Sequence, residues 1–296
     1  MHNRDSVIGA LLVGGLLLAS SVAIADMEPM SEKEMGSVTG QAMLGLDVNE
    51  ADGKYFTRYT VGTRSELQMN MEELALGEDS NCSGSANECR DVGIKNLSLG
   101  HIARQQENFA GNDYEANDIV PFLAMDPYLE LAEEGGNVVG FRMGFTESRG
   151  SLSGSFESLT GRVGIELEDT DSGTVQDGEL LQADGTADNQ RATHFGLSDS
   201  AGCGDQCAPL TAIQTLDVGE RDSNGDPTFT NDFFISFQNQ GLEWESPGDS
   251  DNTVSTNSGV FINIPTAMRL KMQSLQNDPV VPRKRTEYID RGKGLF

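Results

Sequence analysis

Four cysteines lie in two close pairs, a spacing that suits either local disulfides or a soft metal ion. The pairs are Cys82 with Cys89 and Cys203 with Cys207, and each encloses a short polar segment. Closing a short loop costs the least entropy, so we favour these two local bridges over the other connectivities. A metal site would need more ligands, and only His194 lies near Cys203. Because disulfides persist outside the cytoplasm, the cysteines indicate a periplasmic or extracellular protein.

Acidic turns are the second group of residues that could do chemistry. Asp222, Asn224 and Asp226 present alternate side-chain oxygens beside a glycine, and Asp169 and Asp171 do the same in another turn. Calcium prefers several such oxygen ligands. Neither turn completes an EF-hand loop, so the alternative is that these are solvated turn residues. We assign no other metal ligands, and calcium is the only cofactor that the sequence suggests.

Histidine and serine residues give no catalytic signature. No nucleophile elbow, zinc-protease helix, phosphate-binding loop or dinucleotide-binding motif occurs in the chain. Besides His2 the chain has His101 and His194, and pairing either with a nearby Ser198 rests on residue types alone. Paired carboxylates are common throughout so acidic a chain, so spacing cannot single out a glycosidase site. We therefore expect no enzyme activity.

The carboxyl-terminal segment reverses the acidic trend of the chain. Residues 280–296 contain Arg283, Lys284, Arg285 and Arg291. A cluster of this sign can contact acidic surface on its own chain or on another copy. We predict that these four residues form a partner-binding tail.

Apolar and polar residues alternate in several runs, which is typical of half-buried strands. Phe141 and Met143, for example, alternate with Arg142 and Gly144, which predicts that the apolar side faces a core. Pro265 indicates an edge or a bulge in its strand. The runs span residues 67–71, 139–145, 163–167, 233–237 and 262–272. Turn clusters rich in glycine, asparagine and aspartate separate them.

A weak internal repeat leaves the architecture open. The Leu-x-Leu-Gly sequence at residues 74–77 recurs at residues 97–100. This spacing suits successive coils of a β-solenoid, or it reflects ordinary strands that run into turns. We predict an all-β, mostly antiparallel fold, either a β-sandwich or an irregular β-solenoid.

The amino-terminal segment is predicted to be an export signal. Arg4 precedes an uncharged run over residues 7–22, and Ala23 and Ala25 provide the small residues that a signal peptidase requires. We expect a signal helix at residues 1–25 with cleavage before Asp26. The run is short and interrupted by glycines, which argues against a membrane anchor.

Between the signal and the β region, the sequence predicts one short helix. Ser31 and Glu34 have the spacing of a capping box, and Gly36 can end the helix. The expected organisation is a helix and amino-terminal segment at residues 26–45, a β-rich domain at 46–279 and the tail at 280–296.

Composition excludes several classes of function. The chain of 296 residues has 47 acidic against 20 basic side chains, a net charge of −27, which argues against a nucleic acid as partner. Apolar residues make up 37% and glycines number 34, which favours turns and short strands over a helical bundle. Apolar runs are nonetheless spread along the whole length, so a disordered chain does not fit either.

Several segments resemble those of exported Gram-negative proteins described as pilus-assembly proteins of the FilA type. The similar segments are Met-Gly-Ser-Val-Thr-Gly-Gln-Ala at 35–42, Asp-Pro-Tyr-Leu-Glu-Leu-Ala at 126–132 with the strand at 138–145, and Arg-Thr-Glu-Tyr-Ile-Asp-Arg-Gly at 285–292. The resemblance implies a structural protein associated with the cell surface or a pilus. It brings no catalytic residues.

These observations together predict an exported structural or accessory protein of a cell-surface filament or pilus. It would act through protein–protein contacts or self-association, at unpaired strand edges or through its tail. We expect it in the periplasm, on the outer surface or outside the cell, with no transmembrane span in the mature chain. The alternative is a calcium-stabilised extracellular β protein that binds or cleaves carbohydrate.

Overall fold

The structure is a computed structural model that describes residues 44–78, 89–198 and 202–287. The expected signal helix, the short helix near Ser31, Cys82 and Arg291 lie outside these ranges. Strands dominate, and the helical elements of the described ranges are three short 3₁₀ turns: η1 (Gly204–Gln206), η2 (Leu210–Ala212) and η3 (Met272–Gln276). The predicted all-β class is therefore confirmed. None of the described helical turns has the length or apolar character needed to cross a membrane.

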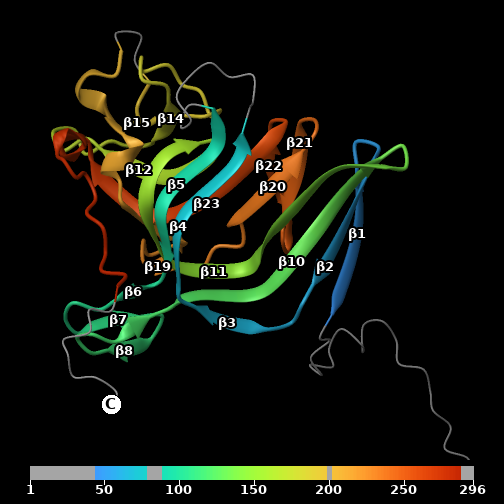
Figure 1. Ribbon diagram of the computed structural model, residues 1–296, viewed down its shortest axis with the longest axis horizontal. Helices are drawn as coiled ribbons and strands as arrows, with labels where there is room; N and C mark the ends of the chain where they lie inside the picture. Colours follow the sequence, from blue (N-terminus) through green and yellow to red (C-terminus); the bar gives the residue numbers. More distant parts are fainter. Residues whose placement is uncertain (1–43, 79–88, 199–201, 288–296) are drawn as a thin grey trace, which may run out of the picture. The chain divides into compact units, whose positions relative to one another are not determined.

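A twelve-stranded sheet forms the body of the protein (Figure 1). Its strands are β1 (Gly45–Ala51), β2 (Lys54–Thr60), β3 (Arg64–Leu67), β4 (Met69–Glu78), β5 (Arg90–Leu99), β10 (Phe122–Glu134), β11 (Asn137–Leu159), β12 (Gly161–Glu168), β13 (Val175–Asp177), β17 (Thr215–Val218), β20 (Phe234–Gln238) and β23 (Gly259–Lys271). All of its strand pairs are antiparallel except β12 with β23. The fold is therefore mostly antiparallel, as the sequence predicts.

Smaller sheets surround this body. They contain β6 (His101–Ile102) with β9 (Ile119–Val120), β7 (Glu107–Phe109) with β8 (Asn112–Tyr114), β14 (Glu179–Leu181) with β15 (His194–Gly196) and β16 (Cys207–Pro209), β18 (Glu220–Arg221) with β19 (Pro227–Thr228), and β21 (Leu242–Ser246) with β22 (Asp249–Thr256). The predicted strand at residues 67–71 is interrupted at Gln68, between β3 and β4. The other four predicted runs are confirmed in β11, β12, β20 and β23, except that Phe233 precedes β20 and Met272 begins η3.

The long strand β11 connects two parts of the sheet. Its first half pairs with β10 and β20, whereas its second half pairs with β5 and β17. Gly150 lies where the partners change, and a Cβ atom there would come within 2.8 Å of the backbone of Phe122. The second half of β11 and its partners enclose the larger core, which includes Ile94, Phe156 and Ile262.

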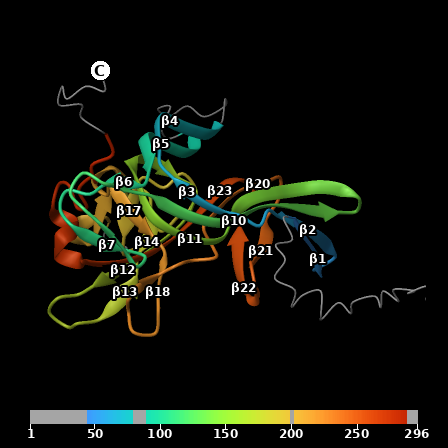
Figure 2. The same ribbon diagram turned by 90° about the horizontal axis from the view of Figure 1, so that it is seen from below.

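The first half of β11 belongs to a projecting part of the sheet. We call this part the wing and define it as β1, β2 and the β10–β11 hairpin over residues 127–145; it extends away from β4 and β5 (Figure 1). The β21–β22 hairpin projects from one side of this sheet (Figure 2). Its Trp244 packs with Phe56, Phe234 and Phe261 into a second core. One side of the wing is thus covered by protein.

The repeated Leu-x-Leu-Gly segments do not form coils of a solenoid. They lie on β4 and β5, which pair with each other in the antiparallel direction, with Glu73 opposite Lys95. Successive solenoid coils would instead stack their strands in parallel. The repeat reflects two strands of one antiparallel pair. Near Pro265 the register between β12 and β23 shifts, so the predicted bulge is confirmed.

Candidate functional site

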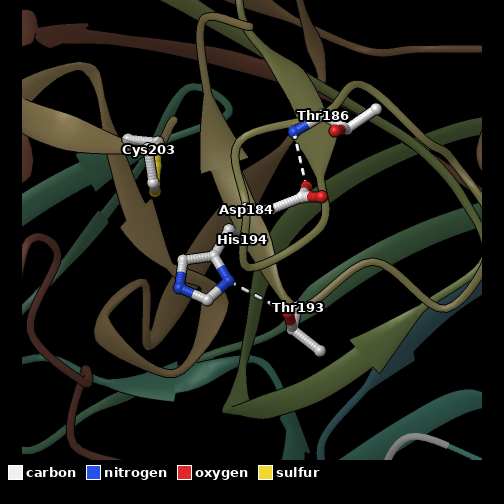
Figure 3. Close-up of a disulfide and its surroundings, with 6 residues drawn as sticks. Asp184, Thr186, Thr193, His194 and Cys203 are labelled. Atoms are coloured by element: carbon white, nitrogen blue, oxygen red, sulfur yellow. Dashed lines mark hydrogen bonds between the residues drawn. A yellow bond between two sulfur atoms is a disulfide. The ribbon is translucent and has the colours of Figure 1, made fainter. Parts of the chain in front are cut away.

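The cysteine pairs support the predicted local bridges. Cys203 and Cys207 form a disulfide around η1, which confirms that pair. Cys89 is also disulfide-bonded, and the partner that the sequence favours, Cys82, lies outside the described residues. Figure 3 shows Cys203 with His194, whose Nδ1 lies 2.9 Å from the hydroxyl of Thr193. Burial lowers the pKa of His194.

The acidic turns use their first carboxylate to hold the loop. Asp222 Oδ1 accepts backbone N–H bonds from Asp226 and Asn224, each at 2.9 Å, and Asp169 Oδ1 accepts one from Asp171 at 2.8 Å. These bonds hold the pKa of both carboxyl groups below the usual value. The described residues contain no cluster of three or more His, Cys, Asp or Glu that could hold a metal. Calcium binding therefore remains a prediction.

The basic tail lies against its own chain as far as it is described. Arg283 donates to Ser98 Oγ at 2.8 Å, Lys284 pairs with Asp217 at 2.6 Å, and Arg285 donates to Asn117 Oδ1 at 2.7 Å. The sequence left open whether the tail contacts acidic surface of its own chain or of another copy. These three basic residues contact their own chain. The role of Arg291 in partner binding stays a prediction, because this residue lies outside the described ranges.

The tail completes a polar cluster that the sequence did not predict. His101 on β6 has Nε2 at 2.6 Å from Glu107 Oε1 and Nδ1 at 3.1 Å from Ser151 Oγ on β11. Lys284 donates to Ser151 Oγ at 2.9 Å and to Asp217 Oδ1 at 2.6 Å. All five residues line a cavity of about 280 Å³. These residues come from distant parts of the chain, so their spacing in the sequence could not predict the cluster. His101 was singled out in the sequence only as one of the three histidines.

This cluster places an acid, a base and a hydroxyl in the order of a hydrolase triad. Burial and the positive charge of Lys284 lower the pKa of His101, against the opposite effect of Glu107. A neutral His101 can donate from Nε2 to Glu107, and the single hydroxyl hydrogen of Ser151 then has two acceptors at 3.1 Å, Nδ1 of His101 and Oδ1 of Asp217. Ser151 is almost fully buried, and Lys284 and Asp217 also contact its oxygen. The contacts therefore fasten the tail to β11 and β17.

Acid should weaken this cluster. The folded-state pKa of His101 lies below its unfolded value of 6.5, so as pH falls below 6.5 the unfolded chain binds a proton at His101 before the folded protein does. The free energy of unfolding therefore falls as pH falls below 6.5. We expect wild-type protein to lose more unfolding free energy than His101→Gln between neutral pH and about pH 5. Urea unfolding at both pH values measures this difference. Equal losses in the two proteins would contradict it, and His194→Gln separates the contribution of the other histidine.

The wing carries a row of apolar side chains across its strands. Leu46 on β1 lies opposite Tyr59 on β2, which lies opposite Leu129 on β10. Leu129 in turn lies opposite Met143 on β11, which lies opposite Ile235 on β20. Directly opposed residues of adjacent strands point to the same side of a sheet. The row therefore crosses five strands on one face.

Large parts of these side chains are exposed. We define the apolar face as the side of the wing that carries Leu46, Val48, Tyr55, Tyr59, Leu129 and Met143. Leu46 is 61% exposed, Val48 64% and Met143 43%. Every second residue of these strands points to this face. Among those residues are the acids Glu50 and Glu133 near the hairpin tips, and none of them is a lysine or arginine. The face is thus apolar over its centre and carries no positive charge.

A buried charge cluster supports the wing from the opposite side. Glu130 on β10 accepts from Arg142 Nε at 2.5 Å and pairs with Arg58 at 3.2 Å. Arg142 is fully buried, donates to the carbonyl of Glu245 and lies 5.0 Å from the ring centroids of Trp244 and Phe234. The prediction that the apolar side of this strand faces a core is therefore wrong at Met143, since the side with Arg142 is the buried one. The Arg142 side is covered by β21, and the Met143 side is open.

Four strands of the sheet, β1, β3, β4 and β13, leave a backbone edge without a partner strand among the described residues, and β1 and β4 are the longest of them. β1 pairs only with β2, and β4 pairs only with β5. Such edges can accept another strand.

No family model, no curated protein and no solved structure matches the chain.

Proposed function

We propose that this protein is an exported structural or accessory component of a cell-surface filament or pilus, and that it acts by protein–protein contact through its apolar face. The exposed apolar row on β1, β2, β10 and β11 is the observation that carries the proposal. Stretches of about seven residues on these four strands cover roughly 400 Å² of sheet. Apolar patches of about 300–600 Å² on monomers are often functional.

The charge distribution supports contact at this face. A net charge of −27 keeps most of the exterior hydrated and repels other acidic surfaces. Lys and Arg are missing from the alternating positions of the apolar face, so the contact would depend on burial of apolar surface. The free edge of β1 borders the same face, and a partner strand could pair there.

Charge introduced on the outer strand tests this proposal. We expect Leu46→Asp with Val48→Asp to weaken association with filaments about tenfold or more, because a buried carboxylate without a partner is costly. Cosedimentation of the mature protein with filaments sheared from producing cells measures the effect, and immunogold microscopy locates the protein on the cell.

Val175→Asp is the matched control for this experiment. Val175 is 38% exposed on β13, outside the wing. The control should cosediment like wild type. Equal cosedimentation of the double variant and wild type would contradict the proposal.

A further inference from the structure

A cavity lies at the base of the wing, where the apolar face meets β4 and β5. Its volume is about 440 Å³. Met69 and Leu99 line it from the β4–β5 side, Leu129 and Met143 line it from the wing, and Ile235 lines it from β20. Ligand sites in proteins typically have volumes of about 300–1,000 Å³. The cavity therefore has the size of a small-molecule site.

The chemistry of the lining restricts what can occupy this cavity. Among the described residues sixteen line it, none of these is charged, and Tyr128 is the one with a polar side-chain atom. A charged or strongly polar ligand would lose its hydration there without gaining hydrogen bonds. An occupant must therefore be a hydrocarbon group.

The backbone of the cavity floor, on β10 and β11, offers no hydrogen bonds to a peptide strand lying on it, whereas β4 in the wall has a free edge. β10 and β11 are interior strands whose neighbours on both sides are paired with them. Their N–H and C=O groups are thus committed to the sheet, and a peptide lying on this floor would leave its own backbone without partners. A hydrocarbon chain brings no such groups.

The cavity continues onto the exposed row of the wing. Leu129 and Met143 belong both to the cavity lining and to the apolar face, and Tyr59 and Leu46 follow on the next strands. A chain longer than the cavity could therefore extend over apolar surface. Its headgroup would stay in solvent, and a headgroup without net negative charge suits a protein of charge −27.

We propose that this cavity binds the hydrocarbon chain of a lipid whose headgroup is uncharged or zwitterionic. This goes beyond the proposed function: the cavity shares Leu129 and Met143 with the apolar face, but the outer positions Leu46 and Val48 do not line it. The site holds the chain in the cavity between the wing and β4, and the bound lipid is in contact with the apolar face.

A photoreactive lysophosphatidylcholine tests this proposal on the unaltered mature protein. The probe carries a diazirine at the end of a hexadecanoyl chain and is used below its micelle-forming concentration. After illumination, peptide mapping should place the label on segments 69–78, 90–99, 127–152 or 233–235, or at Ile262, which together contain the described lining of the cavity. Labelling elsewhere, or none that hexadecanoyl lysophosphatidylcholine competes away, would overturn the proposal.

Binding strength should depend on chain length and on the cavity walls. Among dodecanoyl, tetradecanoyl and hexadecanoyl lysophosphatidylcholines, each additional buried methylene should tighten Kd about fourfold until the chain leaves the cavity. Met69→Asp and Met143→Asp, one on each wall, should each weaken binding about tenfold or more. Both side chains are partly exposed, so the fold should tolerate the change.

Control variants separate this site from the protein–protein contact. Val175→Asp and the pair Leu46→Asp and Val48→Asp should bind the short dodecanoyl lipid like wild type, because none of these residues lines the cavity that holds its chain. If the outer pair loses filament contact and keeps the lipid, both proposals hold. If Met69→Asp and Met143→Asp bind lipid as tightly as wild type, the lipid site is wrong whatever happens at the filament. A second copy filling the cavity would exclude the probe, and this result would also overturn the lipid proposal.

Discussion

Glu130→Ala should lower the free energy of unfolding by about 3–5 kcal/mol, because it leaves two arginines without their carboxylate. Arg142 is fully buried, and the Arg58 side chain is nearly so. Glu130 contacts both, at 2.5 Å and 3.2 Å. The loss should also loosen the packing of Trp244 against Arg142. Trp244 is the one tryptophan of the chain, so its fluorescence during urea unfolding reports on this region.

Glu134→Ala provides the matched control for Glu130→Ala. Glu134 lies on the same strand, pairs with Lys54 at 3.8 Å and accepts from Gln240 at 2.7 Å, but its side chain is 44% exposed. Exposed ion pairs contribute at most about 1 kcal/mol. A similar loss of stability in both variants would contradict the assigned role of the buried cluster.

Gly161→Ala is expected to be the second most damaging change. Gly161 pairs with Ile262 in the parallel ladder between β12 and β23, with a φ of +156°. A Cβ atom there would overlap the carbonyl oxygen of Ile262. Backbone strain and overpacking each cost about 1–3 kcal/mol. We therefore expect a loss of about 2–5 kcal/mol, measured by urea unfolding.

Gly53→Ala separates steric overlap from backbone conformation. Gly53 lies in the turn between β1 and β2 with a φ of +73°, and a Cβ atom there would meet nothing within 4 Å. Its substitution should cost only the conformational penalty of about 1–2 kcal/mol. If the two alanine variants were equally stable, the close approach at Ile262 would not determine the need for glycine at Gly161.

Local patterns in the sequence predicted the strands better than their orientation. The alternation at residues 139–145 gives a strand in the structure, but the side with Arg142 is buried and the side with Met143 is half open. The reason is long-range, since Arg142 gains Glu130 from the neighbouring strand and the carbonyl of Glu245 from a hairpin far along the chain. Periodicity alone carries no information about such partners.

The candidate sites were less accessible to sequence reasoning than the fold. The disulfide between Cys203 and Cys207 followed from loop closure, a local property. The contacts of His101 with Ser151 and of Lys284 with Asp217 depend on how distant strands are ordered. The apolar face depends on the register between β1, β2, β10 and β11, because only aligned strands bring their apolar residues into one row. Single-strand patterns could not supply this alignment.

The two sides of the wing have complementary roles in this account. The charge cluster of Arg58, Glu130 and Arg142 fixes the covered side to β21, which keeps the strands in register. The open side can then present Leu46 and Met143 as one surface. A variant that weakens the cluster should therefore also weaken contacts of the apolar face.

Photocrosslinking from the apolar face in producing cells tests the central claim most directly. Leu46 is replaced by p-benzoylphenylalanine, and Val175 is replaced in the same way as the control. The account predicts covalent adducts with a filament subunit or a second copy of this chain from position 46 and none from position 175. Absence of protein adducts at position 46, or the same adducts from both positions, would contradict it.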